Sequence, residues 1–271
     1  MPSRLLAIQL AVAAATGLLA TGAPALAADD AAIREAIEAR LRKDGLDQSS
    51  NVNVDAGDGE VTLTGIATSL PASRAIEKAA RKEAEIVHNR VEVHLDEPVS
   101  DGNVIEGVRS AILRYPRYGV FDYVQFQVED GSVRLEGWVL HPWKKTDIEG
   151  RVARVPGVRA LRNDLAVQSL SLFDSELRLA LARRIFSDVR FVHYAHHSRP
   201  PFSIIVDRGD VTLAGWVASP VEKAVLGSIA RSALAFSVKN DLHVDGETPA
   251  EDRKAELSKG TRALDGSPIR P

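Results

Sequence analysis

One stretch of the sequence brings an aromatic ring together with several cations: Trp143, Lys144, Lys145, Arg151 and Arg154. A tryptophan flanked by cations suits a lipid interface, because the ring sits at headgroup level while the cations meet phosphate groups. Asp147 and Glu149 lie among these cations, and helix ends commonly carry solvated charge. A contact with lipid or with a partner, and a plain solvated helix face, are therefore both open interpretations of this stretch.

Three large apolar residues occupy equivalent places in three similar strand sequences: Ile66, Trp138 and Trp216. Each follows the glycine of a V-x-L-x-G pattern, so alternation places its side chain on the face opposite to the valine and leucine of that pattern. If helices cover only the valine and leucine face, these side chains need another partner. We expect them at a seam between domains or a partner-binding face, or under a loop of their own domain.

Three histidines form a second cluster of side chains with possible chemistry: His193, His196 and His197. Imidazole groups bind zinc and copper. The chain contains no cysteine, however, and no carboxylate stands at a settled spacing from these histidines. We therefore expect a surface loop here, and we predict neither a metal nor a cofactor.

Motifs for catalysis are absent from the sequence, which contains no G-x-S-x-G elbow, no P-loop and no dinucleotide-binding G-x-G-x-x-G. No two carboxylates form a persuasive pair, and small separate domains offer little room for a cleft. The sequence therefore predicts a protein that is not an enzyme.

The secondary-structure elements that must position these residues occur as three repeats in the sequence. The repeated strand covers residues 59–65, 131–137 and 209–215. An amphipathic helix and a first strand precede each copy, and a proline, a helix-length stretch and a closing strand follow it. A strand–helix–strand connection implies a right-handed crossover and parallel pairing. The predicted fold class is α/β (α+β): three tandem small αββαβ domains, each a three-stranded mixed sheet with two helices on one face.

Each copy also contains equivalent residues with an expected structural role. Aspartates stand where the opening helices need an N-cap: Asp29 or Asp30, Asp101 and Asp174. Glycines occupy the buried strand face, where we expect a helix to pack closely: Gly65, Gly137 and Gly215. Asparagines open the closing strands and are expected to hydrogen-bond a turn backbone: Asn89, Asn163 and Asn240.

The repeats set the expected boundaries at residues 28–98, 99–170 and 171–245. A short linker at 169–173 predicts that the second and third domains pack together. A positive start, an apolar run and Ala25-Leu26-Ala27 indicate a signal peptide over 1–27, cleaved after Ala27. The polar segment 246–271 is expected to be disordered. Because no cysteine follows the signal, the sequence predicts a periplasmic protein that is not a lipoprotein.

The helix–hairpin–helix–strand unit, its V-x-L-x-G strand and its closing N-x-[VL]-x-V strand together resemble the BON domain. The resemblance covers about residues 28–245 as three copies, and the third copy has about five extra residues before its hairpin. It implies a non-enzymatic protein that binds phospholipid membranes or envelope partners, often in osmotic or envelope stress. The matched glycines and asparagines would then be structural.

These observations predict an adaptor that contacts a phospholipid membrane or an envelope component, with a protein–protein interaction module without lipid binding as the alternative. The formal net charge of −3 argues against nucleic acid as a partner. Trp143, Lys144, Lys145, Arg151 and Arg154 are the candidate lipid or partner contacts, and Ile66, Trp138 and Trp216 are the candidate face between domains or toward a partner.

Overall fold

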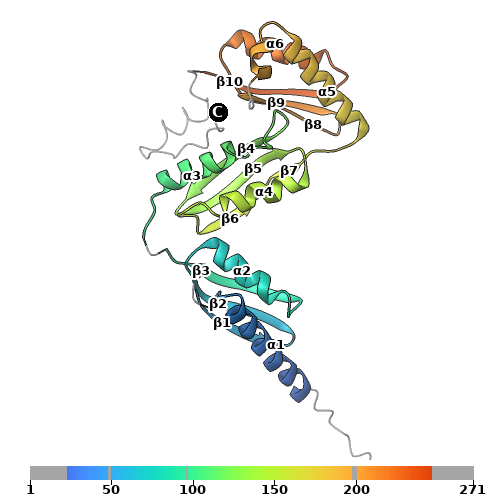
Figure 1. Cartoon of the computed structure of the whole chain (residues 1–271). Helices are drawn as coiled ribbons and strands as arrows, with labels where there is room; N and C mark the ends of the chain where they lie inside the picture. The colour runs from blue at the N-terminus through green and yellow to red at the C-terminus, as the bar shows by residue number, and fades with distance from the viewer. Residues whose placement is uncertain (1–22, 48–49, 96, 197–199, 246–271) are drawn as a thin grey trace, which may run out of the picture.

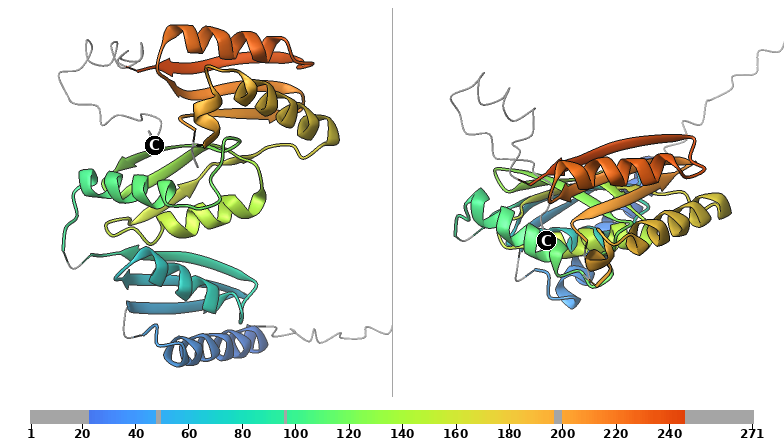
Figure 2. Two further views of the ribbon diagram at one scale, coloured as in Figure 1. Left: turned by 45° about the horizontal axis from the view of Figure 1, so that its top comes forward. Right: turned by 90° about the horizontal axis from the view of Figure 1, so that it is seen from above.

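The computed structural model describes residues 23–47, 50–95, 97–196 and 200–245. The first part of the expected signal peptide, up to residue 22, and the expected tail 246–271 lie outside these ranges. Figure 1 shows three α+β units following one another along the chain, and Figure 2 shows the same succession from two further sides. The fold class predicted from the repeats is confirmed.

Each domain contains a helix, a hairpin, a second helix and a closing strand. Domain 1 consists of α1 (Ala23–Lys43), β1 (Ser50–Gly57), β2 (Glu60–Ala67), α2 (Leu70–Ala80) and β3 (Ile86–Val93). Domain 2 consists of α3 (Asp101–Leu113), β4 (Tyr123–Glu129), β5 (Ser132–Val139), α4 (Pro142–Val152), β6 (Ala160–Asn163) and β7 (Ala166–Val167). Domain 3 consists of α5 (Leu172–Ser187), the 3-10 helix η1 (Val192–His196), β8 (Phe202–Asp207), β9 (Asp210–Val217), α6 (Pro220–Arg231) and β10 (Ser237–Val244).

The middle strand of every sheet is the second strand of the hairpin. It pairs antiparallel with the first strand and parallel with the closing strand, as the crossover predicts. In domain 2 the closing strand is split, and both of its parts, β6 and β7, pair with β5. The buried side chains of β5, such as Val133, Leu135 and Val139, join one core cluster with the apolar stripes of α3 and α4. Each domain therefore buries one face of its sheet under its two helices.

The hairpin turns of the three domains share one backbone geometry. Both turn residues have positive φ in each copy: 54° and 78° at Asp58-Gly59, 48° and 72° at Asp130-Gly131, and 51° and 84° at Arg208-Gly209. Positive φ at both positions is the signature of a two-residue type I′ turn, whose twist matches that of the flanking strands.

The aspartates expected at the helix N-caps hold these turns instead. The Asp101 carboxylate accepts the N–H groups of Asp130 and Gly131, both at 2.8 Å. Asp30 and Asp174 do the same for the equivalent turns of domains 1 and 3. The capping side chains are those of Ser100 and Ser171, and Asp30 lies well inside α1. The N-cap prediction is therefore wrong, because the carboxylates reach across to the turn.

The repeated glycine is required by the neighbouring strand and not by a helix. Gly65, Gly137 and Gly215 have φ of 122°, 115° and 109°. A Cβ at Gly137 would lie 2.2 Å from the backbone oxygen of Tyr123 on β4, and the other two glycines meet the equivalent backbone at 2.0 and 2.5 Å. The expected close packing of a helix is therefore wrong, and the local twist of the hairpin demands a residue without a Cβ.

The repeated asparagine fastens the second helix to the closing strand. The Asn240 amide donates to the Lys223 carbonyl of α6 at 2.9 Å, and its side-chain oxygen accepts the Leu242 N–H. Asn89 and Asn163 make equivalent bonds to α2 and α4. The predicted bond to a turn is thus corrected to a bond between helix and strand, and the structural role stands.

The loop of residues 119–122, between α3 and β4, contains a buried carboxylate. Asp122 is fully buried and accepts the N–H groups of Gly119 and Leu140, both at 2.9 Å. The ammonium of Lys144 lies 2.6 Å from the same carboxylate, and Lys144 is only 7% exposed. The interpretation of Lys144 as a lipid or partner contact is therefore wrong, because its charge is directed inward to compensate Asp122.

The same loop lies against domain 3. The Val120 carbonyl accepts the N–H of Ile204 on β8 at 2.7 Å. Further along β8, the side-chain oxygen of Gln168, which directly follows β7, accepts the N–H of Val206 at 3.0 Å. These bonds occupy backbone groups that an edge strand would otherwise expose.

We predict that Gly137→Ala destabilises domain 2 by about 3 kcal/mol or more, because the methyl group collides with a backbone carbonyl at a strained φ. Hydrogen exchange of residues 132–139 should accelerate. Gly150→Ala is the matched control, because a Cβ in mid-helix α4 meets only the flexible end of Arg154 at 3.6 Å and alanine favours the helix by about 1 kcal/mol. Equal exchange in the two variants would contradict the role assigned to Gly137.

We predict that Lys144→Met destabilises the chain by about 3 kcal/mol, because Asp122 then remains buried without a counter-charge. Lys145→Met removes a neighbouring charge of the same helix and should change stability by less than about 0.5 kcal/mol. Urea unfolding followed by tryptophan fluorescence measures both. Adding Asp122→Asn to Lys144→Met should restore part of the loss, and a double variant no better than the single one would argue against the ion pair.

Candidate functional site

The aromatic and cationic side chains of α4 and the turn after it form a surface on which several of them already contact one another or neighbouring residues. Trp143 is exposed, its ring lies 5.2 Å from the guanidinium of Arg117, and it stacks on His141. The guanidinium of Arg151 lies 5.1 Å from the ring centre of Tyr115, and Arg154 donates to a carbonyl of α4. The structure therefore places Trp143 and Arg151 on α4 and Arg154 in the turn that follows it, while Lys144 is directed away from that surface.

Carboxylates also shape this surface. The Tyr115 hydroxyl donates to Asp147 at 2.9 Å. Burial of the phenol and the neighbouring Asp147 carboxylate raise the pKa of Tyr115 to about 12. Asp147 also lies 3.9 Å from Arg117. The Asp147 carboxylate thus partly balances the cations on this face, in line with the alternative of a solvated helix face that the sequence analysis left open.

The strand tryptophans and Ile66 lie on the helix-free faces, as their parity predicts, but their environments differ. Ile66 is 47% exposed and opposes Asn51 in the register of domain 1. Trp138 is half-buried and opposes Tyr123 on β4. Trp216 is only 5% exposed, and its ring lies 5.1 Å from that of His243. The equivalent strand position is therefore exposed in domain 1, half-buried in domain 2 and buried in domain 3.

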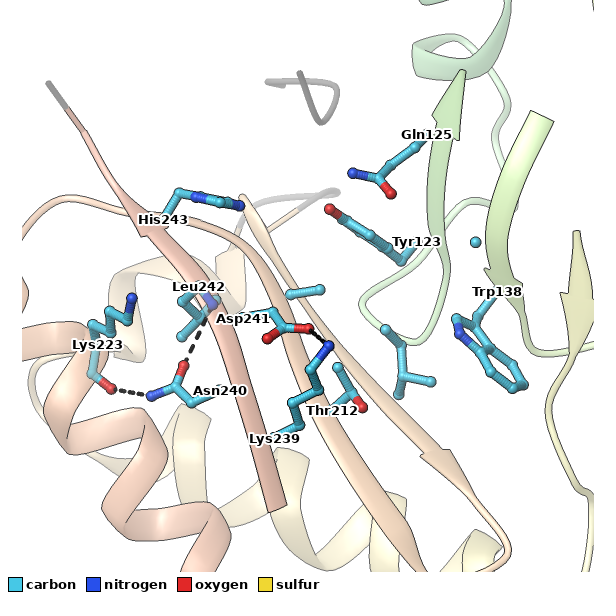
Figure 3. A pocket seen from close by; sticks show the side chains of 13 residues that line it. Tyr123, Gln125, Trp138, Thr212, Lys223, Lys239, Asn240, Asp241, Leu242 and His243 are labelled. Atoms are coloured by element: carbon cyan, nitrogen blue, oxygen red, sulfur yellow. Dashed lines mark hydrogen bonds and ion pairs between the residues drawn. The ribbon is translucent and has the colours of Figure 1, made fainter. Parts of the chain in front are cut away.

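A cleft of about 620 Å³ lies between the helix-free sheet face of domain 2 and the sheet of domain 3, where it also reaches the β10 edge and α6. Domain 2 contributes Tyr123, Gln125, Gly137 and Trp138 to its lining. Domain 3 contributes residues of β8, β9, α6 and β10. Figure 3 shows Tyr123 and Gln125 on β4 opposite the strands that carry Thr212, Lys239 and Asp241.

The lining of the cleft carries two lysines, Lys223 and Lys239, and one carboxylate, Asp241. Lys239 pairs with Asp241 at 2.5 Å. Burial, with a smaller contribution from the Asp241 carboxylate, raises the pKa of Tyr123 to about 12. The phenol therefore stays protonated throughout the physiological range and can donate a hydrogen bond.

Domain 3 also carries exposed apolar residues that sequence analysis had not singled out. We define the phenylalanine patch as Leu172, Phe173, Leu234 and Phe236, whose exposed fractions are 76%, 41%, 85% and 79%. The two phenylalanine rings stack at 5.5 Å. Apolar residues off the buried stripe of a helix, and in a loop, were the sequence signal that could have found the patch.

Metal and membrane signals are weak in the described part of the chain. His193 packs against the ring of Tyr194 at 3.8 Å, and His197 lies outside the described residues. Within the described ranges, no three histidine, aspartate or glutamate residues lie close enough together to hold a metal ion. No helix in those ranges combines the length and the apolar character needed to cross a bilayer.

Solved structures that are similar to this chain include domains of two type III secretion proteins. The C-terminal domain of CdsD from Chlamydia trachomatis is 14% identical, with 78% of this chain and 96% of that chain covered and a TM-score of 0.23. The periplasmic domain of PrgH from S. typhimurium is 14% identical, with 75% and 100% covered and a TM-score of 0.18. Similarity at this level carries no argument about function. A search of curated proteins finds no match.

The family comparison is more extensive. The BON domain matches residues 29–94, 100–169 and 181–246, each of which falls on one of the three αββαβ units. Leu172 and Phe173 precede the third match, so half of the phenylalanine patch lies outside the shared pattern. Three matches in order cover most of the chain, and the chain therefore belongs to the BON domain family, with the domain present in three tandem copies.

Proposed function

We propose that this chain is a non-enzymatic binding protein of the bacterial periplasm that contacts a phospholipid surface through the phenylalanine patch. The observation that carries the proposal is the exposure of four large apolar side chains at one end of domain 3. Membership of a family whose members bind phospholipid supports it. Secretion would use the signal peptide cleaved after Ala27, and the activity would serve osmotic or envelope stress.

Backbone hydrogen bonds hold the segments that carry the two phenylalanine rings of the patch. Phe173 lies in the first turn of α5, which Ser171 caps through the Asp174 N–H at 3.1 Å. Phe236 donates its N–H to the Gly209 carbonyl at 2.9 Å, and its ring lies where a Gly209 Cβ would be. Little conformational freedom would be lost when these rings enter a lipid interface.

Cations flank the patch, as a lipid headgroup requires. Arg208, in the turn beside Gly209, has 85% of its side chain exposed. Arg184 donates to the Ser232 carbonyl at 3.0 Å, at the start of the loop that carries Leu234 and Phe236. Anionic lipid should therefore add an electrostatic attraction that salt screens.

Two further features belong to this proposal. We propose that Trp143, Lys145, Arg151 and Arg154 form a secondary contact with the same surface or with a partner. We also propose that domains 2 and 3 act as one unit, on the basis of the bonds between residues 119–122 and β8. The patch and the α4 surface would then move together.

A protein–protein module is the second candidate function, and the helix-free face of domain 1 favours it. Ile66 and Ile86 are 47% and 45% exposed on that face. His88 and Glu60 pair at 3.1 Å beside Ile86. An apolar face interrupted by charge is typical of a transient protein interface.

We predict that Phe173→Ser combined with Phe236→Ser weakens binding to vesicles of anionic phosphatidylglycerol at least tenfold, because burying one phenylalanine contributes about 1.5–3 kcal/mol. Co-sedimentation at low salt measures the change. Val221→Ser is the matched control, since Val221 is 64% exposed at the opposite end of α6. Equal binding by the two variants would reject the patch, and no binding by the unaltered chain would reject the lipid function.

We predict that Ile66→Glu abolishes crosslinking to any protein partner that uses the face of domain 1, while vesicle binding is unchanged. A charge placed at the centre of an apolar contact costs several kcal/mol when it is desolvated. Thr64→Glu is the control, because Thr64 shares the face without contributing a large apolar group. Unaltered crosslinking after Ile66→Glu would exclude this face as the partner site.

A further inference from the structure

The cleft between the sheets of domains 2 and 3 has features that a domain seam does not need. Its volume of about 620 Å³ falls within the range of small-molecule sites, about 300–1,000 Å³. Two sheet faces that existed only to stabilise each other would interdigitate and leave no such space.

One wall of the cleft is aromatic. Tyr123 on β4 and Trp138 on β5 are register partners on the same face of the sheet. Both line the cleft, and Gln125 extends the same wall two residues along β4. Figure 3 shows these side chains beside the strands of domain 3.

The other wall is polar. Thr212 on β9 and the pair of Lys239 and Asp241 on β10 line it, together with His243. In the described part of the chain, the side chains of Gln125, Trp138 and Thr212 make no hydrogen bond with one another or with other residues. Their donors and acceptors are therefore available to a ligand.

We propose that this cleft binds a short saccharide. The rings of a sugar have apolar C–H faces that pack on aromatic side chains, and their hydroxyl groups bond to hydroxyl, amide and carboxylate groups. The cleft offers an aromatic wall facing a wall with hydroxyl, amide and charged groups, where Lys239 is paired with Asp241 and Lys223 adds a second cation. A long acyl chain would leave these polar groups unsatisfied.

Two bonds outside the cleft join domain 2 to domain 3. Ser203 on β8 donates its hydroxyl to the Asp122 carbonyl at 2.6 Å, and the side-chain oxygen of Gln168 accepts the N–H of Val206 on β8 at 3.0 Å. The separation of the two walls is thus fixed by bonds outside the cleft, so a ligand would meet a preformed site. This inference concerns a different surface from the phenylalanine patch and does not rest on lipid binding.

Calorimetry of the full chain with N-acetylchitotriose and with maltotriose tests the proposal, and co-sedimentation with purified cell-wall sacculi separates a cell-wall source from a free oligosaccharide. We expect saturable binding of at least one trisaccharide, weakened at least tenfold by Trp138→Ala. Thr212→Val, which keeps the shape of the opposite wall, should also weaken it. Leu179→Ala, at an exposed position of α5 outside the cleft, is the control and should bind normally.

Three results would overturn the proposal: no binding of either trisaccharide at millimolar concentration, binding that survives both Trp138→Ala and Thr212→Val, or preferential binding of a tripeptide. Near-ultraviolet circular dichroism shows whether Trp138→Ala remains folded. If it does not, the Thr212→Val result decides. Vesicle binding is measured in parallel, so a failure of the saccharide site and a failure of the lipid function are distinguished.

Discussion

In each domain, a carboxylate on the opening helix accepts two backbone N–H groups from the hairpin turn, and this contact fixes the geometry on which the domain depends. Hydrogen bonds to a charged group contribute about 1.5–3 kcal/mol each, and two of them tie a helix to a strand connection distant in sequence. At Asp174, burial opposes ionisation, but hydrogen bonds from Ser169, Ser171 and the turn N–H groups hold the pKa below its ordinary value. The carboxylate therefore remains charged at neutral pH and keeps the turn in place.

Fixing the helices on one side of each sheet leaves the other side without cover, and the chain meets this constraint differently in each copy. Domain 1 leaves Ile66 open to solvent. Domain 3 buries Trp216, while Trp138 of domain 2 lines a cleft that is not filled. The same position in one repeated unit thus produces an open face, a buried contact and a cavity wall. Function is more readily built on such unequal faces than on the buried cores of the domains.

The fold could be predicted from the sequence because each element occurs in three copies, and the pattern of each copy supports the interpretation of the other two. Alternation in the strands, the Asp-Gly turns and the prolines before the second helices all appear more than once, and the structure agrees with them. The roles of single residues were harder to predict. Asp101 stands at a helix start, where capping is the usual role, and only the fold shows that the hairpin turn lies within reach of its carboxylate. Lys144 has the sequence context of a surface cation, because its partner Asp122 lies 22 residues earlier and nothing local indicates a buried ion pair.

The sequence analysis missed the phenylalanine patch for a related reason. Periodicity identifies the residues that face a core. It gives no information about apolar residues outside that stripe, and only the fold shows whether several of them meet in space. Phe173 and Phe236 are 63 residues apart in sequence, and they stack because the start of α5 and the loop before β10 both meet the hairpin turn of domain 3. The Asp174 carboxylate and the Phe236 N–H approach the same Gly209 from two elements. The contact that fixes the fold of the domain is thus also the one that brings its two most exposed aromatic rings together, so a loss of the clamp at Asp174 would disperse the surface proposed to bind lipid.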